Sequence, residues 1–172
     1  MQLDRQPTLT GPALTVRPLR AEDLEALYAV AADPLLWEQH PSRDRYRREV
    51  FEPFFDEALS CGGGLTVIDR ATGAVIGSSR FDHLDLAASR VEIGWTFLAR
   101  SAWGGAVNRE LKRLMIDHAF AAVDTVVFRI GPENLRSRRA VEKLGAREIG
   151  TSPHPPGPDW IVYELTPADW TG

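Results

Sequence analysis

The chain has 172 residues, with 20 Lys or Arg against 24 Asp or Glu, so its formal net charge is −4. This length predicts one domain that buries about 70% of the surface exposed by the unfolded chain. The slightly acidic balance argues against attraction of the whole surface to nucleic acid. Cys61 is the single cysteine, which excludes an intrachain disulfide and favours a reducing, cytoplasmic setting. No stretch is long and apolar enough to predict a membrane span, and the scattered His residues predict no metal site.

The first half of the chain predicts one strand, two helices and then an antiparallel meander. Residues 1–12 lack an apolar signal core, and they are expected to form a flexible leader before a single domain at 13–172. After these residues we expect a strand at 13–17 and helices at 20–31 and 45–59, and the second helix should be broken or kinked near Pro53. Alternating β-branched and aromatic residues predict meander strands at 65–69, 74–81 and 90–98.

The second half predicts helices alternating with strands. A helix is expected from Asn108, with an apolar face made of Leu111, Leu114, Met115, His118 and Ala119. The other elements expected are a strand at 125–130, a helix at 134–144 and strands at 146–151 and 160–165. Asn134 should cap the second helix, and Gly145 should end it.

Residues 103–108 form a small-residue turn between a predicted strand and the helix. Their sequence is Trp-Gly-Gly-Ala-Val-Asn, and Asn108 is the expected N-cap. The other free N–H groups would point out of the helix start, where the helix dipole adds partial positive charge. The turn therefore predicts a phosphate site, although similar residues also occur in plain tight turns.

Two motifs in this order of elements resemble those of the GNAT superfamily of acyl-CoA-dependent N-acyltransferases. The turn at 103–108 lies where that family has Gln/Arg-x-x-Gly-x-Gly/Ala, and Asn134-x-x-Ser137 with Glu-Lys-Leu-Gly at 142–145 is similar to its second motif. Residues 110–120 resemble the branch that includes ribosomal-protein-alanine acetyltransferases. The resemblance covers nearly the whole chain. It implies an α/β (α+β) fold, with a mixed, mostly antiparallel seven-stranded sheet and about four helices.

The turn departs from the family pattern at three positions. Trp103 replaces Gln/Arg, Ala106 replaces the central Gly, and Asn108 replaces Gly/Ala. The methyl group of Ala106 is compatible with phosphate binding if φ is negative there, whereas a positive φ would cost about 1 kcal/mol or more. The alternative to a working enzyme is a degenerate domain that binds coenzyme A or a partner without catalysis.

The resemblance implies that acetyl-CoA is the co-substrate and that three segments hold it. The phosphates would lie on the turn, which consists of Trp103, Gly104, Gly105, Ala106, Val107 and Asn108. The backbone of Phe97 and Leu98 would face the acetyl group and the pantetheine. Further contacts would come from Asn134, Arg139 and Lys143, although a bare N-cap and solvated cations are equally compatible with these residues.

Ser137 and Glu92 are the expected catalytic residues. Many family members use a Tyr a few residues further on to protonate the departing thiolate; here Ser137, on the inward face of its helix, or a water would do so. The alternative is a hydroxyl bonded to the i−4 carbonyl of its own helix. Glu92 would take the amine proton directly or through water, because desolvation beside the turn would favour the protonated carboxyl. The alternative is a surface pairing of Glu92 with an Arg.

The acceptor is expected to be a primary amine, in particular a protein N-terminal α-amine. At pH 7 an α-amine is roughly 14% neutral and a Lys side chain about 0.04% neutral, and the spacing reveals no His–carboxylate pair to help deprotonation. By analogy, the acceptor contacts should come from 35–44 and 152–159, with Trp37, Glu38, His40 and His154 as candidate residues. No nucleic acid, membrane or metal is expected as a partner, and a homodimer is compatible with the sequence.

A dinucleotide-binding oxidoreductase is the rival from another class. It would need Gly-x-Gly-x-x-Gly near the N-terminus and an acidic residue after the next strand. The predicted strand at 125–130 ends instead in Gly131-Pro132. The sequence therefore favours the acyltransferase.

Overall fold

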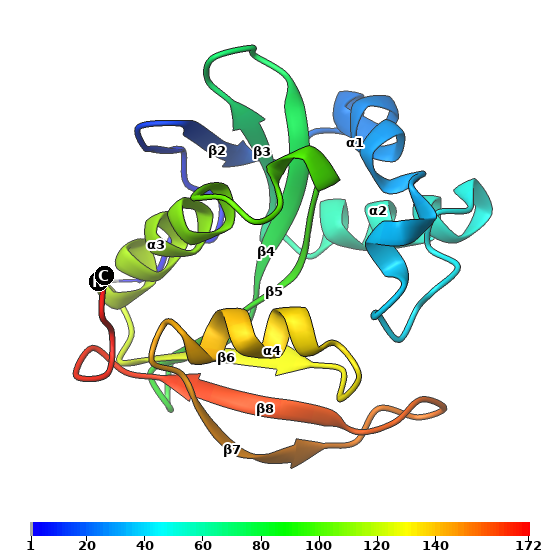
Figure 1. Ribbon diagram of the computed structural model, residues 1–172. Helices are drawn as coiled ribbons and strands as arrows, with labels where there is room; N and C mark the ends of the chain where they lie inside the picture. The colour runs from blue at the N-terminus through cyan, green and yellow to red at the C-terminus, as the bar shows by residue number, and fades with distance from the viewer. Residues whose placement is uncertain (1) are drawn as a thin grey trace.

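The computed structural model describes residues 2–172, which form one mixed sheet with helices on both faces (Figure 1). Among these residues there are eight strands, in the order β1-β2-β3-β4-β5-β6-β8-β7. They are β1 (Leu9–Thr10), β2 (Leu14–Pro18), β3 (Gly64–Asp69), β4 (Val75–Asp85), β5 (Arg90–Leu98), β6 (Thr125–Ile130), β7 (Arg147–Ser152) and β8 (Trp160–Leu165). The β5–β6 pair is parallel and the other neighbouring pairs are antiparallel. The predicted fold class is confirmed, with one strand more than expected.

Four α-helices are present in this part of the chain, with three short 3-10 turns. They are α1 (Leu24–Ala31), α2 (Arg48–Ser60), α3 (Val107–Phe120), α4 (Leu135–Glu142), η1 (Ala21–Asp23), η2 (Pro34–Trp37) and η3 (Arg100–Ala102). The break or kink expected at Pro53 is not a break, because α2 begins at Arg48 and continues through the proline. Pro53 lies on the exposed side of α2, where the carbonyl that lacks its N–H partner can bind water. None of these helices is long and apolar enough to cross a membrane.

Residues 2–12, expected to be a flexible leader, contact the domain. β1 pairs with β2, and Leu3 is buried in the main hydrophobic cluster. The backbone oxygen of Asp4 lies 2.7 Å from Nε2 of His118. An isolated Leu between polar residues has no periodicity, so this docking could not be predicted from the local sequence.

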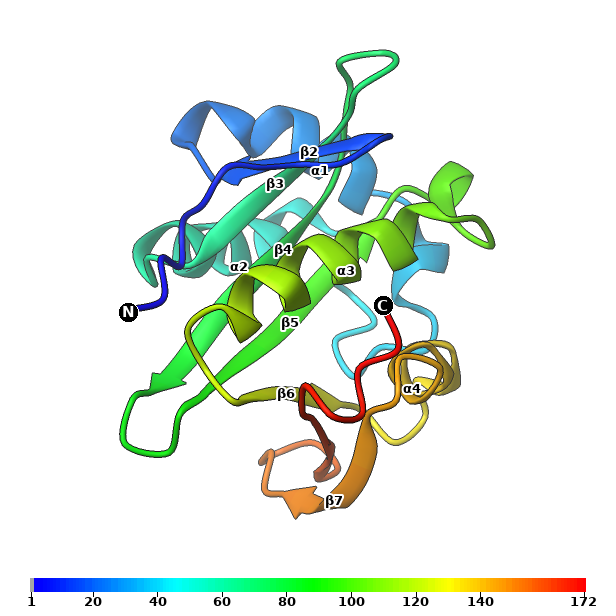
Figure 2. The same cartoon turned by 90° about the vertical axis from the view of Figure 1, so that its left-hand side faces the viewer.

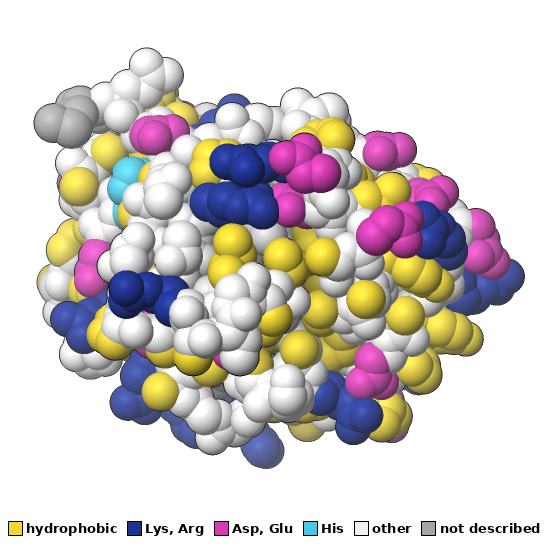
Figure 3. Space-filling model, turned by 90° about the horizontal axis from the view of Figure 1, so that it is seen from above, with side chains coloured by type: hydrophobic (Ala, Val, Ile, Leu, Met, Phe, Trp, Pro, Cys, Tyr) yellow, Lys and Arg dark blue, Asp and Glu magenta, His cyan; other side chains and the backbone are white. Residues whose placement is uncertain are grey.

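Two hydrophobic clusters lie on opposite faces of the sheet. One joins the sheet to α3 and α4, and the other joins it to η2, α1 and α2. Figure 2 shows α3 lying across β4 and β5. Trp103 packs against both clusters. Outside the sheet, Figure 3 shows acidic and basic side chains side by side over one face, so that face has no field of a single sign.

The buried face of α3 is rotated from the predicted one. Its buried residues are Leu111, Lys112, Met115, Ile116 and Ala119. Leu114 and His118 are only partly buried. A cation, Lys112, therefore lies inside the domain.

β5 and β6 part soon after they begin to pair. Their parallel register covers only three residue pairs and ends at Glu92 opposite Val127, and Figure 1 shows the two strands diverging beyond this point. In the same part of β5, Trp95 has a φ of 52° and the register with β4 shifts, which is the mark of a bulge. The backbone edge of β5 after the bulge therefore has no strand beside it on the β6 side.

Candidate active site

The turn before α3 has a geometry that suits an anion. Gly104 takes a φ of 70°, and Ala106 has a φ of −73°, in the right-handed helical region. Because Ala106 is already helical in conformation, α3 begins at Val107. Asn108 is therefore not the N-cap that the sequence predicted, and it lies inside the first turn. Ala106 is the N-cap and makes no side-chain hydrogen bond there.

The backbone amides of this turn are free donors. Within residues 2–172, the N–H groups from Gly104 to Arg109 donate to no backbone or side-chain acceptor. A Cβ atom added at Gly104 or Gly105 would meet nothing within 4 Å, so the space in front of the turn is open. Free amides at a helix start, together with the helix dipole, bind phosphate readily. The methyl group of Ala106 is compatible with this function because φ is negative.

Trp103 connects the turn to β5 and to α4. Its indole N–H donates to the carbonyl oxygen of Leu98 at 3.1 Å. The guanidinium of Arg136 lies 3.7 Å from the centre of the indole rings, a distance typical of a cation–π contact. The side chains of Phe97 and Leu98 are buried. A ligand between the diverging strands would therefore meet the backbone of these residues rather than their side chains.

Glu92 is buried on β5, and its two carboxylate oxygens differ. Oε2 accepts a hydrogen bond from Arg129 and lies 2.7 Å from Nδ1 of His83. Oε1 has no hydrogen-bond partner in the described chain, and a Cβ atom added at Gly94 would lie 3.6 Å from it. The expected pairing of Glu92 with an Arg is present, with the carboxylate buried and Arg129 partly exposed. The structure also contains a His–carboxylate pair that the spacing did not reveal, because a φ of 46° at His83 turns the strand locally.

These side chains line a pocket of about 180 Å³ at the start of the diverging strands. The lining residues are His83, Asp85, Arg90, Glu92, Val127 and Arg129. Since the lining carries both acidic and basic groups, the pocket is polar.

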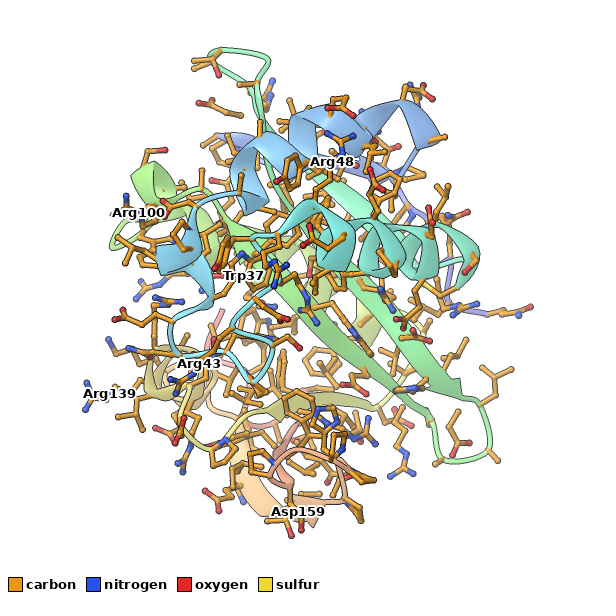
Figure 4. The ribbon with its side chains drawn as sticks, turned by 90° about the vertical axis from the view of Figure 1, so that its right-hand side faces the viewer. Trp37, Arg43, Arg48, Arg100, Arg139 and Asp159 are labelled. Carbon is orange, nitrogen blue, oxygen red and sulfur yellow. The ribbon has the colours of Figure 1, made fainter. Side chains whose placement is uncertain are left out.

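Asn134 caps α4, as predicted. Its side-chain oxygen accepts the backbone N–H of Ser137 at 3.2 Å, and the side chain is buried. The hydroxyl of Ser137 is partly buried and has no hydrogen-bond partner in the described part of the chain, so the alternative bond to the i−4 carbonyl is not formed. Arg139 and Lys143 are exposed on α4, and Figure 4 shows Arg139 at the edge of the molecule.

The four candidate acceptor residues differ in exposure. Trp37 is only 3% exposed and donates its indole N–H to the Ala31 carbonyl at 2.8 Å, so it is a core residue rather than an open contact. Glu38 is exposed. His40 accepts the Ser42 N–H at Nδ1, and burial lowers its pKa to about 3. The ring of His154 lies 4.1 Å from that of Trp160, centre to centre.

The two segments expected on the acceptor side do meet. A second pocket of about 180 Å³ is lined by Gln39, Pro41, Arg43, Pro132, Glu133 and Pro158. These residues come from the 35–44 connection, the turn before α4 and the proline-rich loop. Arg43 and Glu133 form an ion pair across this pocket, at 2.7 Å.

Lys112 is a residue of this region that the sequence analysis missed. Its ammonium group donates to Oγ1 of Thr96 on β5 at 2.9 Å and lies 5.7 Å from the ring centre of Phe128 on β6. Burial lowers the pKa of Lys112 to about 8. Ile116 could have indicated that Lys112 is buried. It follows Lys112 by four residues and so lies on the same side of the helix, which makes the apolar stripe wider than predicted.

Within residues 2–172 no group of three or more His, Cys, Asp and Glu is placed to hold a metal ion.

Comparison with known proteins identifies relatives of this arrangement. The sequence model of a family described as "Acetyltransferase (GNAT) domain" matches residues 13–147. A protein described as "Uncharacterized N-acetyltransferase p20", from Bacillus licheniformis, is 27% identical over 150 residues, which are 83% of this chain and 84% of that protein.

Solved structures share the fold. A GCN5-related N-acetyltransferase from Brucella melitensis superposes with a TM-score of 0.84 at 22% identity, over 96% of this chain and 80% of that one. Mycobacterium smegmatis RimJ in complex with CoA-disulfide gives 0.75 at 19% identity, over 100% of this chain and 93% of that one.

Proposed function

The chain belongs to the GNAT acetyltransferase family, whose members use acetyl-CoA, and we propose that it transfers the acetyl group to a primary amine, in particular the α-amine of a protein N-terminus. The observation that carries the proposal is the row of free amides from Gly104 to Arg109 beside the diverging strands. That a fold of this kind is found with CoA-disulfide in M. smegmatis RimJ supports the choice of ligand. The resemblance of residues 110–120 to the ribosomal-protein-alanine branch favours a protein N-terminus.

The free amides would hold the pyrophosphate, and the backbone of Phe97 and Leu98 would hold the pantetheine and the acetyl group. The Leu98 carbonyl already accepts the Trp103 indole, so the pantetheine would use the remaining backbone groups. Asn134 would contact the pantetheine, and Arg139 and Lys143 would reach the nucleotide phosphates. Acetyl-CoA supplies the activated acetyl group.

Glu92 is the proposed base. Oε2 is fixed by Arg129 and His83, and Oε1, beside Gly94, is left to take the amine proton directly or through water. The side chain of His83 is 60% exposed, so it offers the proton a route to solvent. Glu92→Gln should flatten the rising limb of the pH–rate profile. If the limb stays intact, the amine's own ionisation sets it.

Ser137 is the proposed proton donor to the leaving thiolate, because its hydroxyl has no partner in the described chain. Ser137→Ala should lower kcat far more than it weakens acetyl-CoA binding, since the bond acts mainly in the transition state. An unchanged kcat would leave that proton to water.

The test of the whole proposal is ligand stabilisation of the fold. Acetyl-CoA at about 100 times its Kd should stabilise the protein by about 2.7 kcal/mol, visible as a raised Tm. Gly105→Glu should abolish this shift by placing a carboxylate where the phosphates bind. The fold itself should tolerate the change, because φ at Gly105 is unstrained and a Cβ atom meets nothing within 4 Å.

Asn108→Ala is the matched control. Asn108 does not cap α3 and its side chain makes no hydrogen bond in residues 2–172, so this variant should keep most of the shift. Equal shifts in wild type and Gly105→Glu would place the ligand elsewhere. Stabilisation by acetyl-CoA without turnover of any amine would favour the alternative, a domain that binds coenzyme A without catalysis.

A further inference from the structure

Two arginines carry the unsatisfied buried donors of this molecule. Among the described residues, the buried side-chain nitrogens without a hydrogen-bond partner are Nε of Arg45 and both Nε and Nη2 of Arg80. A guanidinium stays charged in proteins and its donors form a rigid fork. Leaving such donors buried without an acceptor is costly. Because the unpartnered nitrogens belong to two neighbouring arginines, they point to a ligand that accepts from both.

Arg80 lies on β4 and is only 1% exposed. Its Nη1 donates to Glu57 at 2.9 Å and lies 3.5 Å from Asp82. Its guanidinium carbon is 4.5 Å from the ring centre of Trp95 and 5.8 Å from that of Phe54. The remaining two nitrogens therefore face no acceptor of the protein.

Arg45 comes from the connection before α2 and meets the same aromatic ring. Its guanidinium carbon lies 4.1 Å from the ring centre of Phe54 and 5.2 Å from that of Trp37, and its Nη2 donates to Ser42 at 3.2 Å. Arg45 is only partly buried, so it is the more accessible of the two guanidinium groups. In Figure 4, Trp37 marks this face beside α2.

This pair of arginines lies next to the proposed reaction centre. Arg80 is opposite Gly94 in the β4–β5 register, and the Trp95 ring that it stacks on belongs to the bulge. The phosphate-binding turn is followed by α3, on the opposite face of the sheet. The arginines therefore face the side where the acceptor, rather than acetyl-CoA, would approach.

The charges near the two arginines favour a singly charged ligand. Glu57 and Asp82 already contact Arg80, and His40 contributes no charge at neutral pH because burial lowers its pKa to about 3. A doubly charged phosphate would add more negative charge to this balanced group than a carboxylate would, and the two oxygens of a carboxylate match the planar donor fork.

We propose that the acceptor amine carries a carboxylate, which Arg45 and Arg80 bind on the α2 side of the β5 bulge. The inference rests on the proposed acetyltransferase function and specifies its substrate. The carboxylate belongs either to a free amino acid or to an acidic side chain next to a peptide N-terminus. The aromatic rings of Trp37, Phe54 and Trp95 exclude water from the guanidinium groups, which strengthens the ion pair.

The test compares acceptors that differ only in the carboxylate. One arm pairs a set of amino acids with their carboxamides, and the other pairs peptides that have Glu or Gln as their second residue. In the arm that matches the natural acceptor, kcat/KM should be roughly tenfold to a hundredfold higher for the acceptor with the carboxylate than for its amide counterpart. Arg45→Gln should remove most of that preference, mainly through KM, and Arg45→Lys should retain part of it.

Two controls separate binding from folding. Arg47→Gln changes an exposed arginine of the same connection and should keep the preference. Each variant should keep its Tm shift with acetyl-CoA, because the phosphate-binding turn is unchanged. Arg80→Lys is assayed for the carboxylate preference once it shows this Tm shift. Equal kcat/KM within both pairs, or a preference that survives Arg45→Gln, would overturn the inference and leave the acetyltransferase standing. No turnover of any amine would refute both.

Discussion

The two faces of β5 bury cations in different ways. On the α3 face, Lys112 has one hydroxyl partner, Thr96, and an aromatic ring, and burial lowers its pKa to about 8. On the α2 face, Arg45 and Arg80 lie against aromatic rings beside acidic groups, and burial lowers the pKa of Arg45 only to about 10. At neutral pH the arginines keep their charge, whereas Lys112 is close to losing its proton. Side-chain chemistry thus makes one face suited to holding an anion and the other sensitive to pH.

Replacing Lys112 with Met should have the largest effect. The pKa of Lys112 falls from 10.5 to about 8 on folding, so burial of its charge costs at most about 3 kcal/mol at pH 7. Lys112→Met should therefore raise the free energy of unfolding by up to that amount. Between about pH 8 and 10.5 the Lys112 amine is protonated in the unfolded chain but neutral in the folded protein. The free energy of unfolding of the wild type therefore rises with pH through this window, and the difference in stability between Lys112→Met and wild type shrinks. Denaturant titrations at pH 7 and 10 measure both. An advantage that stays constant with pH would contradict the buried charge.

Removing the hydroxyl partner should have the next largest effect. Thr96→Val leaves the Lys112 ammonium without its hydrogen bond and should lower the free energy of unfolding by about 2 kcal/mol at pH 7, since bonds to charged groups are the stronger ones. The loss should be smaller at pH 10, where the amine is largely neutral. In the Lys112→Met background the same change should cost much less, and full additivity of the two changes would show that the pair does not interact.

The smallest effect should come from the arginine face. Phe54→Leu removes the ring that both guanidinium groups approach, which should lower the free energy of unfolding by about 1 kcal/mol. Since Arg45 keeps its charge well below its pKa of about 10, this loss should be the same at pH 6 and pH 8. A pH-dependent loss would mean that the two faces respond alike.

The sequence predicted some elements well and others poorly, for physical reasons. Arg90–Leu98, Thr125–Ile130 and Trp160–Leu165 have the predicted bounds because continuous β-branched and aromatic residues mark a strand by local pattern alone. Asn108 was assigned as a cap from its residue type, but the cap depends on the φ of Ala106, which local sequence does not set.

The burial of Arg80 and Lys112 could not be predicted from local sequence, for a different reason. Arg80 meets Glu57 and Phe54 of α2 only once α2 packs on the sheet, and Lys112 is enclosed only between β5 and β6. Glu92 could be proposed from its place on the strand before the turn and Ser137 from the family motif, but the free Oε1 and the unbonded hydroxyl required the structure. Contacts between residues distant in the chain decide which charged side chains are buried.

Trp103 connects the two hydrophobic clusters. Its ring packs against both hydrophobic clusters, its N–H is bonded to β5, and Arg136 of α4 stacks on it. The two halves of the fold therefore share a side chain as well as a strand, and neither can open without exposing part of the other. Heat or denaturant should unfold them in one all-or-none transition, with equal calorimetric and van't Hoff enthalpies.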